Sequence, residues 1–142
     1  MQDKVFLDSN ILIYCYSNSE LEKQKVARNI FERYDNPNIS KQVINEVSNI
    51  FFKKFKLDPN SVENAVLQIS DLVTIFDFSL ITQIKAIRLK KDYNLQFYDA
   101  LIIATALENN CTILYSEDMQ DGLVVENKLT IINPFKGTND KN

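Results

Sequence analysis

The sequence predicts an α/β fold in which helices cover both faces of a parallel sheet. Short apolar runs alternate along the chain with longer segments whose apolar residues recur at helical spacing. Most residues of the short runs are apolar, which is typical of strands buried on both faces of a parallel sheet. The 142 residues, 45% of them apolar, suffice for one domain with a sizeable core, predicted over residues 1–137 and followed by a polar tail over residues 138–142.

Strands are predicted where an apolar run stops at a polar residue or at a proline. In chain order these runs are residues 5–7, 38–40, 73–76, 111–115 and 129–132. Residues 123–125 are open to two interpretations, a hairpin partner of the last strand or an irregular loop.

Helices are predicted from apolar periodicity and from residues that cap helix ends. A short helix follows the first strand at residues 11–14, and longer helices follow near residues 20–34 and 43–54, after Pro59, after Ser79 and over residues 100–107. The predicted caps are Ser79, Asp58 before Pro59, and a capping box of Ser19 with Glu22.

Two of these helices have a predicted orientation. In the helix after Ser79, we expect Leu80, Ile84 and Ile87 to face inward. Residues 100–107 are apolar on nearly every side, so that helix should be buried.

The residue types that are scarce exclude several kinds of chemistry. The chain has no His, which excludes a Ser-His-Asp or Cys-His catalytic site and a His-ligated zinc. Its 2 Gly cannot form the glycine-rich loops that bind dinucleotides or nucleoside triphosphates. Cys15 and Cys111 follow no metal-binding pattern, and we expect them to be free thiols of a reduced, cytoplasmic protein.

The overall charge gives no reason to expect a polyanionic ligand. The net charge is -3, whereas proteins that bind nucleic acid or anionic membranes usually have a basic excess. No segment has the pattern of a signal peptide or a membrane span, so we expect no membrane partner. Contact with RNA would need a local cluster, for which Lys53, Lys54 and Lys56 are the candidates, although a solvated helix face is the plainer interpretation.

Acidic residues are predicted to gather where the parallel strands end. Asp8 follows the first strand, Asp118 follows the strand over residues 111–115, and Asp99 lies in the first turn of the buried helix. Glu46 lies at the margin of an inward helix face. Taken singly, each has a plain interpretation as a turn residue, a helix-start acid or a solvated side chain. The argument for a site rests on their convergence.

Four segments contain these acids in a fixed order: FLDSNIL at residues 6–12, VINEV at 43–47, YDALIIATA at 98–106 and ILYSED at 113–118. Together they resemble the successive motifs of the PIN-domain ribonucleases, especially the bacterial VapC-type toxins. The resemblance extends over about residues 5–135 and implies a three-layer α/β/α fold with a central parallel sheet.

The resemblance also implies a ribonuclease site that binds a divalent metal. Matched motif by motif, Asp8, Glu46, Asp99 and Asp118 fall on the family's metal-binding carboxylates. Ser116 falls on its usual Ser or Thr, Asn10 on a small polar position, and Asp121 on an additional acid that only some members have. Hard carboxylate oxygens suit Mg²⁺ or Mn²⁺, the implied cofactors. The implied reaction leaves 5′-phosphate and 3′-hydroxyl ends on RNA, and the implied partners are an antitoxin that covers the active site and a second copy in a homodimer.

Other classes of protein give competing interpretations. A stand-alone or inactive PIN-like domain would serve as an RNA-binding or protein-interaction module, and the presence of all four acids argues against that loss of activity. Phosphoaspartate phosphatases need an Asp two residues after the first, where this chain has Asn10. Receiver domains need an acidic pair before the first Asp, and residues 4–7 contain none.

Overall fold

A six-stranded sheet forms the centre of the structure, a computed structural model that describes residues 3–138. The strands are β1 (Val5–Leu7), β2 (Asn38–Ser40), β3 (Thr74–Phe76), β4 (Ile113–Tyr115), β5 (Val124–Val125) and β6 (Leu129–Ile132). Their order in the sheet is β3-β2-β1-β4-β6-β5, and each neighbouring pair is parallel except β5 with β6. The hairpin interpretation is therefore confirmed. The predicted tail lies outside the described residues except for Thr138.

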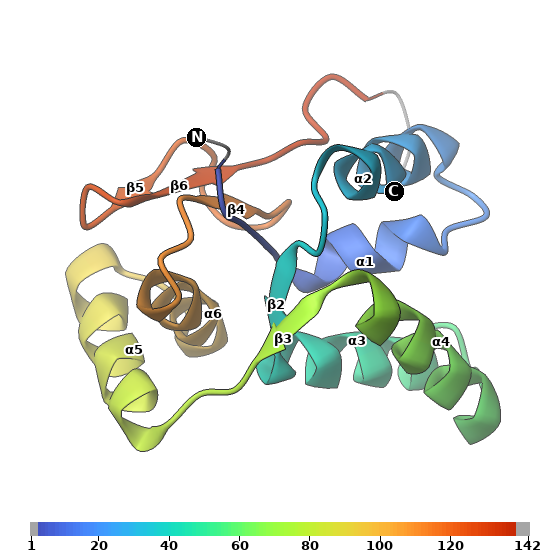
Figure 1. Ribbon diagram of the computed structural model, residues 1–142, viewed down its shortest axis with the longest axis horizontal. Helices are drawn as coiled ribbons and strands as arrows, with labels where there is room; N and C mark the ends of the chain where they lie inside the picture. The colour runs from blue at the N-terminus through green and yellow to red at the C-terminus, as the bar shows by residue number, and fades with distance from the viewer. Residues whose placement is uncertain (1–2, 139–142) are drawn as a thin grey trace.

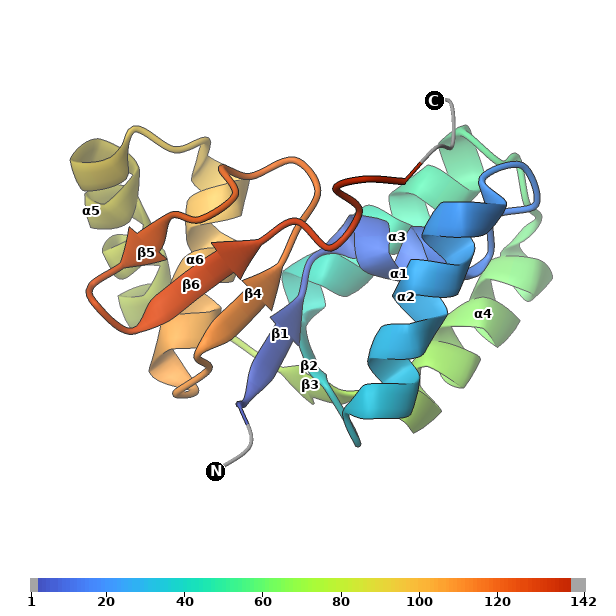
Figure 2. The same cartoon turned by 90° about the horizontal axis from the view of Figure 1, so that it is seen from above.

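Helices flank this mainly parallel sheet, and the three-layer α/β/α fold is confirmed. The helices are α1 (Ser9–Cys15), α2 (Leu21–Arg33), α3 (Lys41–Lys53), α4 (Pro59–Leu72), α5 (Leu80–Tyr93) and α6 (Phe97–Glu108). Figure 1 shows α5 and α6 together on the left and α1 to α4 on the right of the central strands. Seen from above, β1, β4 and β6 run in the same direction, so their carboxyl ends meet at one edge (Figure 2).

Side-chain caps explain where two of the helices begin. The Asp58 carboxylate accepts a hydrogen bond from the backbone N–H of Ser61, with Pro59 in the first turn of α4, as predicted. Ser79 caps α5 in a capping box with Thr82.

The capping box predicted from Ser19 and Glu22 is wrong. The N-cap of α2 is Glu20, whose side chain makes no capping hydrogen bond. The hydroxyl of Ser17 instead accepts from the backbone N–H groups of Ser19 and Glu20, at 3.4 and 3.1 Å. Ser17 ends the tight turn after α1, and its hydroxyl fixes the backbone of Ser19 and Glu20 just before α2 begins.

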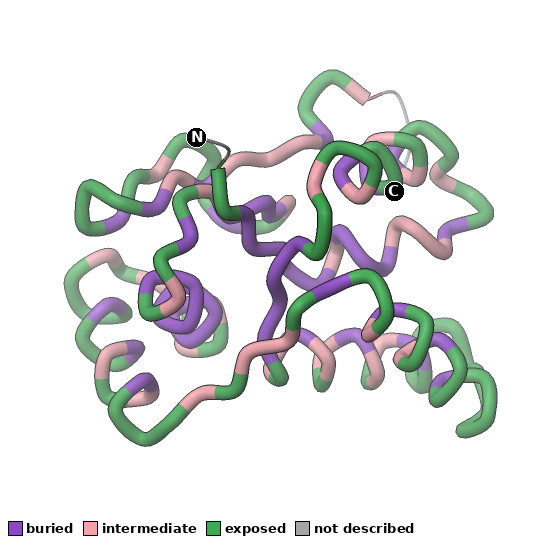
Figure 3. The backbone as a smooth tube through the Cα atoms, in the orientation of Figure 1, coloured by how far each residue is buried: buried purple, intermediate pink, exposed green. Residues whose placement is uncertain are grey.

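Helix α6 is buried over most of its length, as predicted. Residues 100–107 are all buried, and Figure 3 shows the buried segments running through β1, β2 and α6. Within residues 3–138, no helix has the length and apolar character needed to cross a membrane. The thiols of Cys15 and Cys111 are free, as expected.

The predicted inward face of α5 is wrong. Leu80, Ile84 and Ile87 are 71%, 42% and 54% exposed, whereas Thr82 and Ala86 are fully buried. Apolar residues lie on several sides of α5, so hydropathy alone does not select a face. The buried face is the one that packs against α6. Thr82 and Ala86 lie on this face because their small side chains allow the two helices to approach closely.

Candidate active site

The register of β1 against β4 places Asp8 beside Ser116. Leu7 is opposite Tyr115, so the next residue of each strand emerges at the same edge. The Ser116 hydroxyl donates to Asp8 Oδ2 at 2.8 Å, and the backbone N–H of Ser9 donates to Asp8 Oδ1 at 2.7 Å. Asp8 is also the N-cap of α1. One oxygen of its carboxylate is therefore held at the start of α1, and the other is held by Ser116, which follows β4.

Burial is the main influence on the pKa of Asp8. The residue is 5% exposed, and burial raises the pKa of its carboxyl group because the charged form loses water. The hydrogen bonds from Ser116 and Ser9 act in the opposite direction, and the charge of Asp118 raises the pKa further.

Glu46 approaches the same edge from α3. Ser40, the last residue of β2, accepts a hydrogen bond from the N–H of Val43 and so begins α3 directly at the sheet edge. Glu46 is half-buried, as expected from its marginal position, and accepts from Gln42 Nε2 at 3.3 Å. Burial raises the pKa of Glu46, and the charges of Asp8 and Asp99 add to this.

Asp99 lies in the first turn of α6. Burial, and then the charges of Asp8 and Asp118, raise the pKa of Asp99 from 3.8 to about 6. After burial, the groups that shift this pKa are Asp8 and Asp118, so these two acids of the predicted set lie within electrostatic reach of Asp99.

Asp118 is the exposed member of the set, and Asn10 holds it in place. The Asn10 side-chain amide donates to Asp118 Oδ2 at 2.7 Å, across 108 positions in sequence. The structure thus brings together Asp8, Glu46, Asp99, Asp118, Asn10 and Ser116. Within the described residues, the ion pairs involve other carboxylates, and no three acidic or thiol side chains are close enough to hold one ion directly.

Asp121 is directed elsewhere. Its carboxylate accepts from the backbone N–H of Asn133 at 2.7 Å and pairs with Lys136 at 2.9 Å. These two contacts hold the pKa of Asp121 below its usual value. Asp121 therefore connects the loop after β4 to the segment after β6, which contains Asn133 and Lys136.

Residues next to the site were missed in the sequence. Lys23 Nζ lies 2.8 Å from Glu117 Oε2, and the Tyr14 hydroxyl donates to Glu117 Oε1 at 2.6 Å. Lys23 is 5% exposed and has helical spacing to the buried Ala27. The signal in the sequence is a Lys at a position where helical spacing places it on the apolar, buried face of α2. A charged group on such a face needs a partner of opposite charge.

The predicted basic cluster is exposed at the end of α3. Lys53, Lys54 and Lys56 all face solvent, and Lys54 lines a cavity of about 360 Å³ that Asn10 also lines. Of the three lysines, Lys54 therefore lies at the cavity that adjoins the acidic edge at Asn10.

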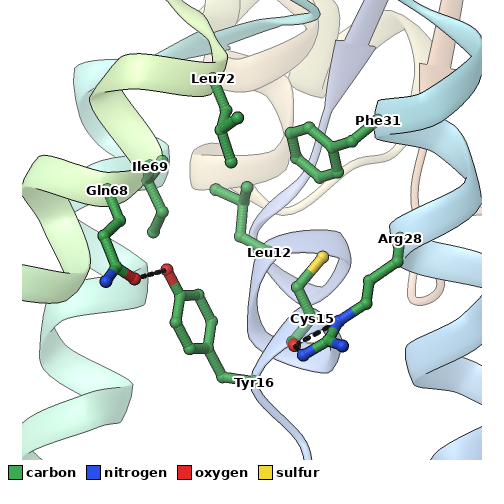
Figure 4. Close-up of a pocket in the computed structure, with 8 residues that line it drawn as sticks. All are labelled: Leu12, Cys15, Tyr16, Arg28, Phe31, Gln68, Ile69 and Leu72. Carbon is green, nitrogen blue, oxygen red and sulfur yellow. Dashed lines mark hydrogen bonds between the residues drawn. The ribbon is translucent and has the colours of Figure 1, made fainter.

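A different cavity lies between α1, α2 and α4 (Figure 4). It has a volume of about 290 Å³, and its lining includes Leu12, Ile69 and the thiol-bearing Cys15 but none of the clustered acids. Burial raises the pKa of Cys15 to about 11, and that of Cys111 likewise to about 11. Burial therefore favours the protonated form of both thiols near neutral pH and disfavours the reactive thiolate.

The fold and this edge together define an α/β domain with an acidic site at the carboxyl ends of parallel strands. The family model of the PIN domain matches residues 5–120. The chain belongs to the PIN-domain family.

Solved structures of similar fold come from several bacteria. A chain of a toxin–antitoxin complex from Klebsiella pneumoniae has a TM-score of 0.70 and 22% identity, over 92% of this chain and 97% of that chain. VapC20 of Mycobacterium tuberculosis, a toxin that cleaves the sarcin–ricin loop, has a TM-score of 0.67 and 13% identity, over 80% and 89%. A chain of VapBC2 from Rickettsia felis, bound to a DNA fragment from its promoter, has a TM-score of 0.64 and 16% identity, over 89% and 96%. No curated protein matches the sequence.

Proposed function

We propose that this protein is an endoribonuclease that uses Mg²⁺ or Mn²⁺ to cleave RNA phosphodiester bonds, and that it is the toxin of a toxin–antitoxin pair in the cytoplasm. The observation that carries the proposal is the electrostatic coupling of Asp8, Asp99 and Asp118, which come from separate elements and meet at one edge of the sheet. Membership of the PIN-domain family and the fold shared with VapC20, a toxin that cleaves RNA, support it.

The donor set fits a hard divalent cation. Carboxylates that raise one another's pKa are mutually repelled, and a cation among them removes that repulsion. Asp8, Asp99 and Asp118 would hold the ion, and Glu46 would bind it or orient the attacking water. Because the acids repel one another, we expect the cation to draw their side chains closer than they lie here. When bound, such an ion polarises the scissile phosphate and lowers the pKa of a bound water.

The other residues of the edge orient these acids. Ser9 and Ser116 leave Asp8 little freedom to rotate, and Asn10 holds one oxygen of Asp118. Without the cation, the carboxyl group of Asp99 is protonated at pH values below about 6. The exposed lysines at the end of α3 are proposed to bind the phosphates of the RNA.

An antitoxin protein is the proposed regulatory partner. Two of the similar structures are chains of toxin–antitoxin complexes. In this proposal the antitoxin covers the acidic edge and so blocks access of RNA to Asp118, the most exposed of the four acids.

A homodimer is proposed through the exposed face of α5. Leu80, Ile81 and Ile84 are 71%, 77% and 42% exposed and lie next to one another on this helix. Arg88 and Asp92 flank the same face, so two copies related by a two-fold axis could pair Arg88 with Asp92 twice. Burial of this apolar face would supply the association energy.

Cleavage of RNA by the purified protein tests the proposed function. A pool of structured RNA is incubated with Mg²⁺, with Mn²⁺ or with EDTA, in parallel with the Asp99→Asn variant. We expect cleavage by the wild type only with metal, products with 5′-phosphate ends, and no cleavage by the variant. Absence of metal-dependent cleavage, or equal cleavage by Asp99→Asn, would overturn the proposal. RNA that is bound but not cleaved would point to a binding module.

A further inference from the structure

The cavity beside the acidic edge carries an inference about the substrate. It encloses about 360 Å³ and lies between α1, the segment that leads into α2, and the end of α3. This is the size of an ordinary small-molecule site. Asn10 lines the cavity with the same side chain that donates to Asp118. The cavity therefore adjoins the acidic edge at Asn10.

The end of α3 positions a cation and an aromatic ring at this cavity. Lys54 is the C-cap, the N–H of Phe55 still donates to the carbonyl of Ile50 at 3.3 Å, and Lys56 then turns the chain with a φ of 54°. The ring of Phe55 packs on that of the buried Phe51, with centroids 5.7 Å apart, yet stays 38% exposed. The backbone and Phe51 thus hold Phe55 in a fixed place with part of its ring uncovered.

The lining combines an apolar surface with hydrogen-bonding groups. Phe55, Ile13 and Ile50 supply the apolar surface, while Asn10 and Glu20 supply polar groups. A nucleobase has the same two-sided chemistry, with apolar faces that stack on aromatic rings and polar edges that hydrogen bond. In a duplex these faces and edges are already occupied, so only an unpaired base can enter such a cavity.

The charges next to the cavity favour RNA over an apolar protein segment. Lys54 lines the cavity together with one carboxylate, that of Glu20, and the exposed Lys53 and Lys56 flank Lys54 and Phe55 in the chain. The net charge of -3 offers no general attraction to phosphate, so these lysines are the local source of it. An apolar segment would gain nothing from these lysines, whereas they can neutralise phosphates of a nucleotide chain. Exposed aromatic rings among lysines are typical of surfaces that bind single-stranded nucleic acid.

We propose that this cavity binds one unpaired nucleotide of the RNA, with its base on Phe55 and its phosphate at Lys54. The inference rests on the proposed function, because the nucleotide in the cavity belongs to the same RNA that is cleaved at the acidic edge. It makes the protein selective for single-stranded segments. Asn10 links the bound nucleotide to the carboxylate that acts next to it.

Binding measured without cleavage tests this assignment. The Asp99→Asn protein is titrated into a labelled single-stranded oligoribonucleotide and into the same strand in a duplex, and 2-aminopurine placed at successive positions reports stacking. We expect Phe55→Leu to weaken single-strand binding about tenfold and to abolish the quenching of 2-aminopurine, since a stacked base contributes this much affinity. Phe55→Tyr, which keeps the ring, should retain both. Lys54→Gln should weaken binding without abolishing the quenching.

Phe52→Leu is the matched control, because Phe52 lies three residues before Phe55 and is 43% exposed but does not line the cavity. Its affinity should equal that of the parent protein. Equal effects of Phe55→Leu and Phe52→Leu, or equal affinity for duplex and single strand, would overturn the inference and leave the cavity to a protein partner. Binding that depends on Phe55 without any cleavage by the wild type overturns only the nuclease. Cleavage with a KM unchanged by Phe55→Leu overturns only the nucleotide site.

Discussion

The ammonium group of Lys23 lies 2.8 Å from the carboxylate of Glu117, in a pair that joins α2 to the loop after β4. Only 6% of the Lys23 side chain and 18% of the Glu117 side chain are exposed. Tyr14 donates to the other carboxylate oxygen of Glu117. Because Glu117 lies between Ser116 and Asp118, this pair fixes the segment that contains two residues of the candidate site.

Removal of Lys23 should therefore destabilise the protein. Lys23→Met leaves the Glu117 carboxylate buried without its cation, which costs about 3 kcal/mol in the free energy of unfolding. Lys41→Met is the control, since the pair of Lys41 with Asp77 is 61% and 68% exposed. Its loss should cost under about 1 kcal/mol. Urea unfolding compares the two variants, and equal losses would show that the Lys23–Glu117 pair contributes no more than a surface pair.

Titration calorimetry with Mn²⁺ should separate the acids that bind metal from the one that does not. Asp8→Ala should abolish the binding heat, and Ser116→Ala, which removes the hydroxyl that orients Asp8, should weaken binding about tenfold. Asp121→Asn should bind as the wild type does, because Asp121 is occupied by Asn133 and Lys136. Unchanged binding by Asp8→Ala would remove Asp8 from the ligand set.

The raised pKa of Asp99 predicts a pH-dependent stability in the absence of metal. With a pKa of about 6 in the folded protein and 3.8 as its ordinary value, Asp99 binds more protons folded than unfolded between these values. Stability therefore falls as the pH rises through this window. In EDTA at pH 7.5, Asp99→Asn should melt about 3 °C above the wild type, a small shift because the group is half exposed to screening solvent.

The difference should shrink as the pH approaches 4, where the folded wild type also has a neutral Asp99. The exposed Asp35→Asn serves as the control and should show no comparable gain at pH 7.5. A constant difference in Tm between pH 4 and 7.5 would contradict the linkage to Asp99.

The oligomeric state should depend on α5. Ile81→Glu places a charge at the centre of the exposed apolar face and should convert a dimer into a monomer in analytical ultracentrifugation. Leu67→Glu, at a position 56% exposed on α4, should leave the dimer intact. A dimer that survives Ile81→Glu, or a wild type that sediments as a monomer, would refute the proposed interface.

Local chemistry made much of this molecule predictable. Asp58 and Ser79 each accept a hydrogen bond from an N–H of the first helical turn, and Pro59 has no N–H that needs a partner, so these helices begin where the sequence indicates. The apolar helix over residues 100–107 could only be buried. Asp8 and Ser116 directly follow strands that pair in parallel, which brings their side chains to one edge.

The sequence by itself determined the strands and helices, the central helix and the acids at the ends of the strands, because each depends on neighbours within a turn or on continuous apolar runs. Only the tertiary structure decided which face of α5 is buried, that Asn10 holds Asp118, and that Asp121 pairs with Lys136. Those outcomes depend on contacts between residues far apart in the chain or between packed helices. No local pattern encodes them, since the same side chain can turn to solvent, to a neighbouring helix or to a partner that only the fold places beside it.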